Sequence, residues 1–167
     1  PRGICGSALI DATAELLRTG LLDLTGRLLA PGECPAGTPP ALRDRLHPDA
    51  AANTYDFLLA EAPDGKGIYL RQKDIRQMQL ASGAIAAAIR ILLRQAGLEA
   101  DDLREVLVAG GFGSFIRRHH AKRIGLLPDL PFARIHYVGN TSIWGAKLAA
   151  FSDEAREELR AIVRRTT

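Results

Sequence analysis

The chain has 167 residues with 47% hydrophobic and 25% charged side chains, a composition typical of one globular domain. Its 22 basic and 19 acidic residues leave a net charge of only +3, so no nucleic acid is expected as a partner, because proteins that bind polyanions concentrate positive charge more heavily. No apolar run approaches the ~18 residues that a membrane span requires, and we expect no membrane partner either.

The two cysteines, Cys5 and Cys34, are too few for a disulfide framework and cannot by themselves ligate an iron–sulfur cluster or a structural zinc. The first residues also lack the basic end and apolar middle of a secretory signal. We therefore expect a cytoplasmic protein. Since the sequence starts with Pro1 rather than methionine, we interpret it as a piece of a longer chain.

The first predicted element is an amphipathic helix over residues 7–18. Ser7 is its expected N-cap, and Gly20 is expected to end it. Prolines and glycines interrupt residues 21–53, so this stretch is expected to be an irregular surface excursion. Its apolar part, 21–29, is expected to contact the core.

Two short apolar runs, 55–61 and 68–71, flank Asp64-Gly65 and predict a β-hairpin. A long helix is predicted over 74–96, ending at Gly97. Apolar and small residues recur along this helix at intervals of three and four, which predicts one broad buried face. That face comprises Ile75, Met78, Gln79, Ser82, Ile85, Ala86, Ile89, Leu92 and Leu93.

The last third of the sequence alternates between strands and helices. Strands are predicted at 105–109 and 134–138, the first as a strand buried on both faces. Helices are predicted at 114–123, 141–150 and 152–165. This order implies a parallel strand pair joined by a crossover. The fold class is therefore α/β, with short parallel strands, covering helices and an inserted β-hairpin.

Each of the two predicted parallel strands is followed by a glycine-containing turn that opens a helix. Ligands of open α/β sheets bind at this end of the strands. Glycines there leave the backbone bare for a flat ring or a phosphate, and the helix start adds free N–H groups. The candidate binding residues are Gly110, Gly111, Phe112 and Gly113 after the first strand, and Gly139 and Asn140 after the second.

A third candidate lies before the first helix, where Gly3, Gly6 and Ser7 could bind an oxyanion. Cys5 would have a lowered pKa there, although a small buried cysteine is the plainer interpretation. The histidines of the basic run 117–123 are adjacent, so on a helix they point about 100° apart and cannot share a metal ion well. We interpret this run as a solvated basic face.

Five segments taken together resemble the C-terminal region of the ATP-dependent reductive activators of corrinoid proteins. They are residues 3–11, 73–81, 108–113, 124–128 and 138–146, in this order. That family belongs to the actin-like ATPase superfamily, which includes sugar kinases, Hsp70 and actin. The resemblance covers nearly the whole chain.

The resemblance implies a ribonuclease H-like subdomain of an actin-like ATPase, with residues 1–167 as a single domain and 30–66 as an irregular insertion that includes the hairpin. It implies ATP and Mg²⁺ as ligands of the full protein, with 110–113 as the turn that contacts adenosine. The reaction it implies is ATP hydrolysis coupled to reduction of cob(II)alamin to cob(I)alamin in a partner corrinoid protein or methyltransferase. The electron would come from an iron–sulfur domain elsewhere in the full protein.

The chain also departs from a complete activator. It has no aspartate-plus-glycine phosphate loop and no iron–sulfur ligand set, so the N-terminal subdomain and the iron–sulfur domain are expected to lie outside it. Alone it is expected to bind nucleotide weakly or not at all, with no catalytic residue of its own, and a second copy could cover its apolar face as a homodimer. Two alternatives stay open: an activator of a radical dehydratase or reductase, and a non-catalytic actin-like interaction domain.

Overall fold

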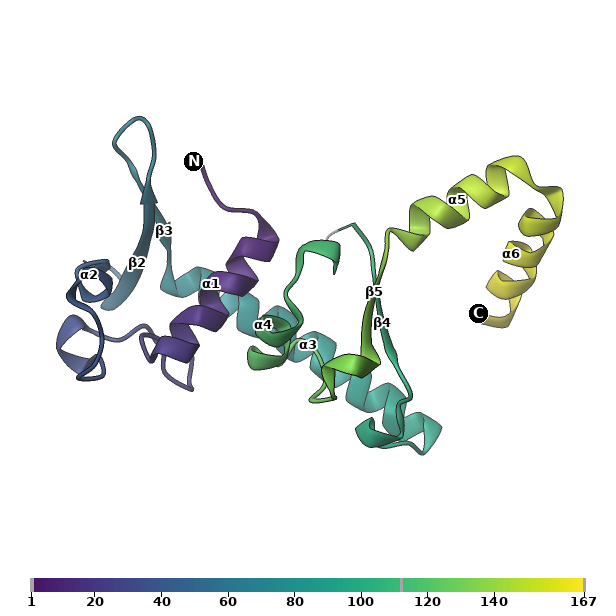
Figure 1. The fold of residues 1–167 in the computed structure, drawn as a ribbon, viewed down its shortest axis with the longest axis horizontal. Coiled ribbons are helices and arrows are strands. Elements are labelled where there is room, and N and C mark those ends of the chain that lie inside the picture. Colours follow the sequence, from purple (N-terminus) through teal and green to yellow (C-terminus); the bar gives the residue numbers. More distant parts are fainter. Residues whose placement is uncertain (1, 112, 167) are drawn as a thin grey trace.

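The computed structural model describes residues 2–111 and 113–166 and shows a mixed α/β arrangement. Over these residues it forms a three-stranded antiparallel sheet and a two-stranded parallel sheet (Figure 1). The strands are β1 (Leu46–Asp49), β2 (Thr54–Glu61), β3 (Gly67–Leu70), β4 (Val106–Ala109) and β5 (Ile135–Gly139). The α-helices are α1 (Gly6–Thr19), α2 (Pro40–Arg43), α3 (Gln72–Ala96), α4 (Arg118–Arg123), α5 (Thr141–Phe151) and α6 (Asp153–Thr166). Short 3₁₀ turns lie at Pro31–Glu33, Ala100–Asp102, Gly113–Phe115 and Phe132–Arg134.

Helix α1 confirms the predicted element but not its cap. Gly20 ends the helix in the left-handed region at φ 70°, as expected of a C-terminal glycine. The helix starts one residue early, at Gly6, so that Cys5 occupies the N-cap and Ser7 lies inside the first turn. The side chain of Cys5 makes no capping hydrogen bond.

The hairpin β2–β3 is confirmed, with Phe57 opposite Leu70. The stretch expected to be irregular also contributes an edge strand, β1, which places Leu46 opposite Phe57. Pro48 lies in this edge strand, where a missing N–H is tolerated. This sheet, the apolar face of α1 and the start of α3 enclose one core. Its buried members are Leu16, Leu21, Leu22, Leu28, Leu46, Phe57, Leu70 and Ile75.

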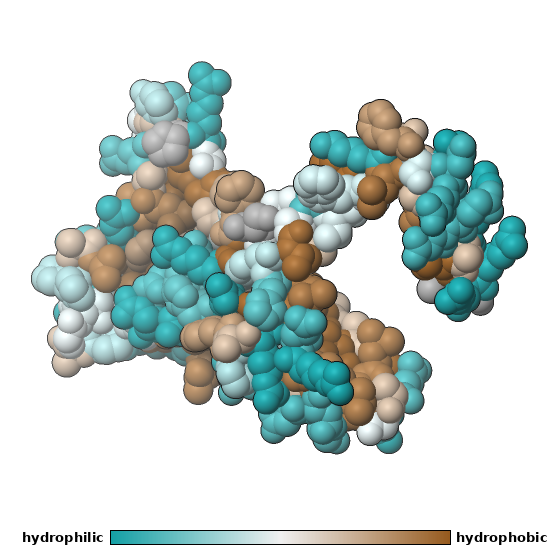
Figure 2. Space-filling model, turned by 45° about the vertical axis from the view of Figure 1, so that its right-hand side comes forward, coloured by the Kyte–Doolittle hydropathy of each residue, from teal (hydrophilic) through white to brown (hydrophobic). Residues whose placement is uncertain are grey.

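Helix α3 has buried residues only in its first half, so the prediction of one broad buried face was wrong for the rest of its length. Gln72 and Ile75 are buried in the first turns, whereas Ile85 is 45% and Leu92 65% exposed. The cause is geometric, because the helix extends beyond the elements that pack against its first half (Figure 1). Figure 2 shows apolar side chains uncovered at the far end of this helix.

The parallel pairing of β4 and β5 is confirmed, with Val106 opposite Ile135. The prediction that β4 is buried on both faces was wrong, because Leu107 is 56% exposed. The predicted helix 114–123 was also too long. The chain is extended at Arg117, which lets Ile116 enter the core, and α4 starts one residue later.

Helices α5 and α6 form an arm that projects from the rest of the chain (Figure 1). They pack on each other, and the side chain of Ser152 accepts a hydrogen bond from the N–H of Ala155 at the start of α6 (3.1 Å). Large apolar side chains of α5 are open to solvent, with Phe151 at 90% exposure. Figure 2 shows them as brown patches along the arm. Both the arm and the parallel sheet therefore present apolar surface that the described chain does not cover.

Candidate functional site

The two glycine turns expected to bind a ligand lie together at the carboxyl ends of β4 and β5. The N–H of Gly110 donates to the carbonyl oxygen of Gly139 at 2.8 Å, which joins the turns. Gly110 has φ 109° and Gly139 has φ 72°, conformations that residues with a β-carbon rarely adopt. Among the described residues other than the chain neighbours, no atom lies within 4 Å of the position that a β-carbon would take at either glycine. The backbone is therefore bare and accessible at both turns.

The other residues of these turns have distinct structural roles. A β-carbon at Gly113 would lie 3.0 Å from Cγ1 of Val108, so this glycine allows the turn to fold back on β4. A β-carbon at Gly111 would make only an ordinary contact, 3.5 Å from Nδ2 of Asn140. Oδ1 of Asn140 accepts a hydrogen bond from the N–H of Ile143 (3.2 Å), which caps α5. Phe112, the remaining candidate, lies outside the described residues.

The third candidate segment lies at the start of α1. Cys5 is exposed, so the interpretation as a small buried cysteine was wrong. Its Sγ lies 3.1 Å from Oγ of Ser7, and this hydrogen bond, together with backbone N–H groups of the first turn, lowers the pKa of the thiol. Gly3 has open space around it. Gly6 begins the helix, so the first turn presents N–H groups.

The elements that carry the three candidate segments share one apolar cluster. Ile10 in α1 packs against Ile116, three residues after the turn that follows β4, and Tyr137 of β5 joins the same cluster. The structure thus connects α1, the segment after β4 and β5, although the segments themselves are far apart in the sequence.

The prediction that the basic run around α4 is a solvated face was right for the exposed residues Arg117, Arg118, His119 and Arg123, but wrong for His120. The side chain of His120 is buried, with only 1% of the residue exposed. Its Nδ1 lies 2.5 Å from Oδ1 of Asp11, and its Nε2 lies 2.9 Å from Oε1 of Glu15. The pKa of Glu15 is lowered to about 2, first by its hydrogen bond with Arg18 and also by that with His120. The sequence signal for this contact is the pair of carboxylates at i and i+4 in α1, Asp11 and Glu15, but the pair does not indicate that a histidine lies against it.

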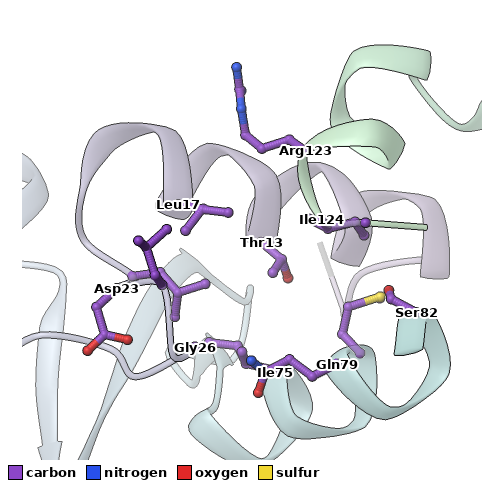
Figure 3. A pocket seen from close by; sticks show the side chains of 13 residues that line it. Thr13, Leu17, Asp23, Gly26, Ile75, Gln79, Ser82, Arg123 and Ile124 are labelled. Carbon is purple, nitrogen blue, oxygen red and sulfur yellow. The ribbon is translucent and has the colours of Figure 1, made fainter. Parts of the chain in front are cut away.

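A separate pocket of about 340 Å³ lies between α1, the loop that follows it, α3 and the end of α4 (Figure 3). Thr13, Ile75, Gln79 and Ile124 line its centre. None of the three candidate segments contributes to it. This pocket is therefore distinct from the glycine turns.

The glycine turns offer uncovered backbone and a side-chain amide, groups that can contact a flat ring and its sugar. They offer no charged side chain for a triphosphate. Within residues 2–111 and 113–166 no group of three or more histidine, cysteine, aspartate or glutamate side chains could hold a metal ion. No helix in this described part is long and apolar enough to cross a membrane.

Comparison with known proteins identifies the family and the fold. The family model of the C-terminal domain of RACo, the ASKHA domain, matches residues 1–167. The corrinoid activation enzyme RamQ of Eubacterium limosum is 36% identical over 169 residues, which cover 100% of this chain and 28% of that protein. The [Co(II) methylated amine-specific corrinoid protein] reductase of Methanosarcina barkeri is 28% identical over 103 residues, covering 62% of this chain and 19% of that protein.

A solved structure of a reductive activator for a corrinoid, iron–sulfur protein superposes on 96% of this chain with a TM-score of 0.78 and 33% identity, and the match covers 24% of that protein. The chain thus spans about a quarter of the length of RamQ and about a quarter of the length of the solved activator. The similarity confirms the predicted actin-like fold, which is a nucleotide-binding fold, and the predicted resemblance. On the match over its whole length, the chain belongs to the family of the C-terminal ASKHA domain of RACo.

Proposed function

We propose that this chain is the C-terminal part of the ATPase domain of a reductive activator that drives cob(II)alamin to cob(I)alamin in a corrinoid protein. The observation that carries the proposal is the joined pair of glycine turns, with Gly110 bonded to Gly139 at the ends of two parallel strands. The named relatives support the same reaction class, since all three are activators or reductases of corrinoid proteins. They favour this function over activation of a radical dehydratase.

In this proposal the chain's own residues bind and orient the nucleotide. The bare backbone at Gly110, Gly111 and Gly139 lies against the adenine or ribose, with Nδ2 of Asn140 beside Gly111. Phe112, which lies outside the described residues, stays a prediction from the sequence for the same contact. When bound, ATP supplies the free energy for the uphill electron transfer, and none of the described side chains at the turns is placed to act as a general base.

The start of α1 would contact a phosphate group of the nucleotide. The N–H groups of the first turn at Gly6 and Ser7 and the open space around Gly3 favour an anion there. The aspartates that hold Mg²⁺ and the phosphate loops would come from the N-terminal subdomain, and the iron–sulfur cluster from a further domain of the full protein. Residues 1–167 then form one structural unit, with 30–66 as its insertion.

The uncovered apolar surface supports this division of the protein. The bare face of β4 at Leu107 and the open apolar side chains of α5 are what a two-subdomain ATPase would cover with its other half. The same surface could be covered by a second copy of the chain, as a homodimer. The partner that receives the electron is a corrinoid protein or a methyltransferase that carries one. A cytoplasmic location suits the two free thiols, Cys5 and Cys34.

The experiment that tests the proposal uses the full-length protein. Its ATP hydrolysis is followed with and without a corrinoid protein in the cob(II)alamin state, while the absorbance of cob(I)alamin is recorded under a low-potential reductant. ATP-dependent reduction with stimulated hydrolysis is the expected result. Binding of the corrinoid protein without any nucleotide binding would instead favour the non-catalytic interaction domain.

A further inference from the structure

Helix α4 contacts two different parts of the chain, one on each of two opposite sides. It starts five residues after Gly113, the last residue of the turn that follows β4. One side of α4 faces α1, and the other faces the segment that leads into β5. Five of the six basic or imidazole side chains at 117–123 are divided between these two partners, and His119 is exposed.

On the α1 side, His120 lies between two carboxylates. Asp11 and Glu15, one turn apart in α1, face its two ring nitrogens at 2.5 and 2.9 Å. Two cations flank the same carboxylates: Nε of Arg117 lies 3.5 Å from Oδ2 of Asp11, and Nη1 of Arg123 lies 3.8 Å from Oε1 of Glu15. Because His120 is nearly fully buried, water cannot replace either bond. Breaking one of them leaves a buried polar group without a partner.

On the β5 side, two cations bind backbone carbonyl groups. Nη1 of Arg118 donates to the carbonyl oxygens of Phe132 (3.0 Å) and Ile135 (2.9 Å), and Ile135 is the fully buried first residue of β5. Nζ of Lys122 donates to the carbonyl oxygen of Leu130 (2.7 Å). These three bonds fix the segment that enters β5, whose far end carries Gly139.

These contacts connect all three candidate segments through one short helix. The turn at 110–113 leads into α4, α4 is bonded to the helix that begins at Gly6, and α4 is bonded to the strand that ends at Gly139. We propose that His120 is a positioning residue that sets the start of α1 relative to the glycine turns, and through them the fit of the nucleotide. The inference rests on the proposed nucleotide site and adds a residue to it that touches no nucleotide itself.

The test substitutes His120→Gln in the full-length protein and measures ATP affinity by calorimetry, at a temperature where thermal unfolding shows the variant to be folded. We expect ATP affinity to fall on the order of tenfold, a size typical of substitutions that act through a network between sites. The matched control is His119→Gln, an exposed neighbour in the same helix, which should bind ATP like the wild type.

A merely structural role of His120 would lower the melting temperature and leave the ATP affinity of the folded protein unchanged, and that result would overturn the inference. Asp11→Asn tests the same contact from α1, and decides the question if His120→Gln does not fold. Because both substitutions cut the bond between His120 and Asp11, the double variant should lose clearly less affinity than the two single losses combined, and full additivity would contradict the inference. A wild-type protein that binds no ATP would overturn the proposed function, and this inference with it.

Discussion

Substitution of Gly111 separates the nucleotide-binding role of the glycine turn from its structural role. A β-carbon there would meet only Nδ2 of Asn140 at 3.5 Å, an ordinary van der Waals contact, and the residue does not need the left-handed backbone conformation. Gly111→Ala should therefore change the free energy of unfolding by no more than about 0.5 kcal/mol. Gly110 would be a poorer probe, because its φ of 109° adds backbone strain to any substitution.

A ligand that lies against the same backbone cannot tolerate the added carbon. An extra methyl group in a packed contact costs about 1–3 kcal/mol, which corresponds to a loss of ATP affinity of roughly 5- to 150-fold. Gly111→Val should abolish measurable binding. The assay is calorimetric titration of the full-length variants with ATP, alongside urea unfolding of the same samples. A stable Gly111→Val protein that binds ATP like the wild type would refute the placement of the nucleotide at this turn.

Three further predictions concern stability and thiol chemistry. Gln72→Ala should lower the free energy of unfolding by about 3 kcal/mol in urea titrations. The Gln72 amide accepts a hydrogen bond from the N–H of Leu28 (2.8 Å) and donates one to the carbonyl oxygen of Gly26 (2.6 Å), and each buried group left without its partner costs about 1–3 kcal/mol. A change below about 1 kcal/mol would contradict this account. Cys5 should react with iodoacetamide faster than Cys34 near neutral pH, because hydrogen bonds lower the pKa of the Cys5 thiol and burial raises the pKa of the Cys34 thiol. Equal rates would show that the helix start does not activate Cys5. The pKa of Glu15 falls from its usual 4.5 to about 2 on folding, so its contribution to stability is complete above pH 4.5 and is lost as the pH falls toward 2. Glu15→Gln should remove this part of the pH dependence of the free energy of unfolding. An unchanged pH dependence in the variant would argue against the ion pairs of Glu15.

Local signals in the sequence were sufficient for most helices and for the parallel pair. Periodic apolar residues predicted α1 and α3, and the glycines at 20 and 97 marked their ends, because a left-handed C-cap favours glycine. The glycine turns were predicted from their position after apolar strands. The structure then showed that they are joined by a hydrogen bond, which no local pattern reports.

Three features could not be predicted for physical reasons. His120 binds carboxylates 105 and 109 residues away, so nothing near it in the sequence distinguishes it from exposed His119. The apolar pattern of α3 and β4 indicates which faces avoid water but not which part of the protein covers them, and residues such as Leu92 and Leu107 are left exposed here. The edge strand β1 was missed because Pro48 counts against a strand unless its position at the edge is known.

The central claim, that the domain couples ATP to the reduction of a corrinoid, is tested most directly with the full-length protein and a corrinoid protein in the cob(II)alamin state. The measurement is the rise of cob(I)alamin absorbance under a low-potential reductant, with and without ATP, together with the rate of ATP hydrolysis. The account predicts that cob(I)alamin forms only with ATP, that the corrinoid protein stimulates hydrolysis, and that Gly111→Val loses both. ATP hydrolysis with neither stimulation nor reduction would contradict it.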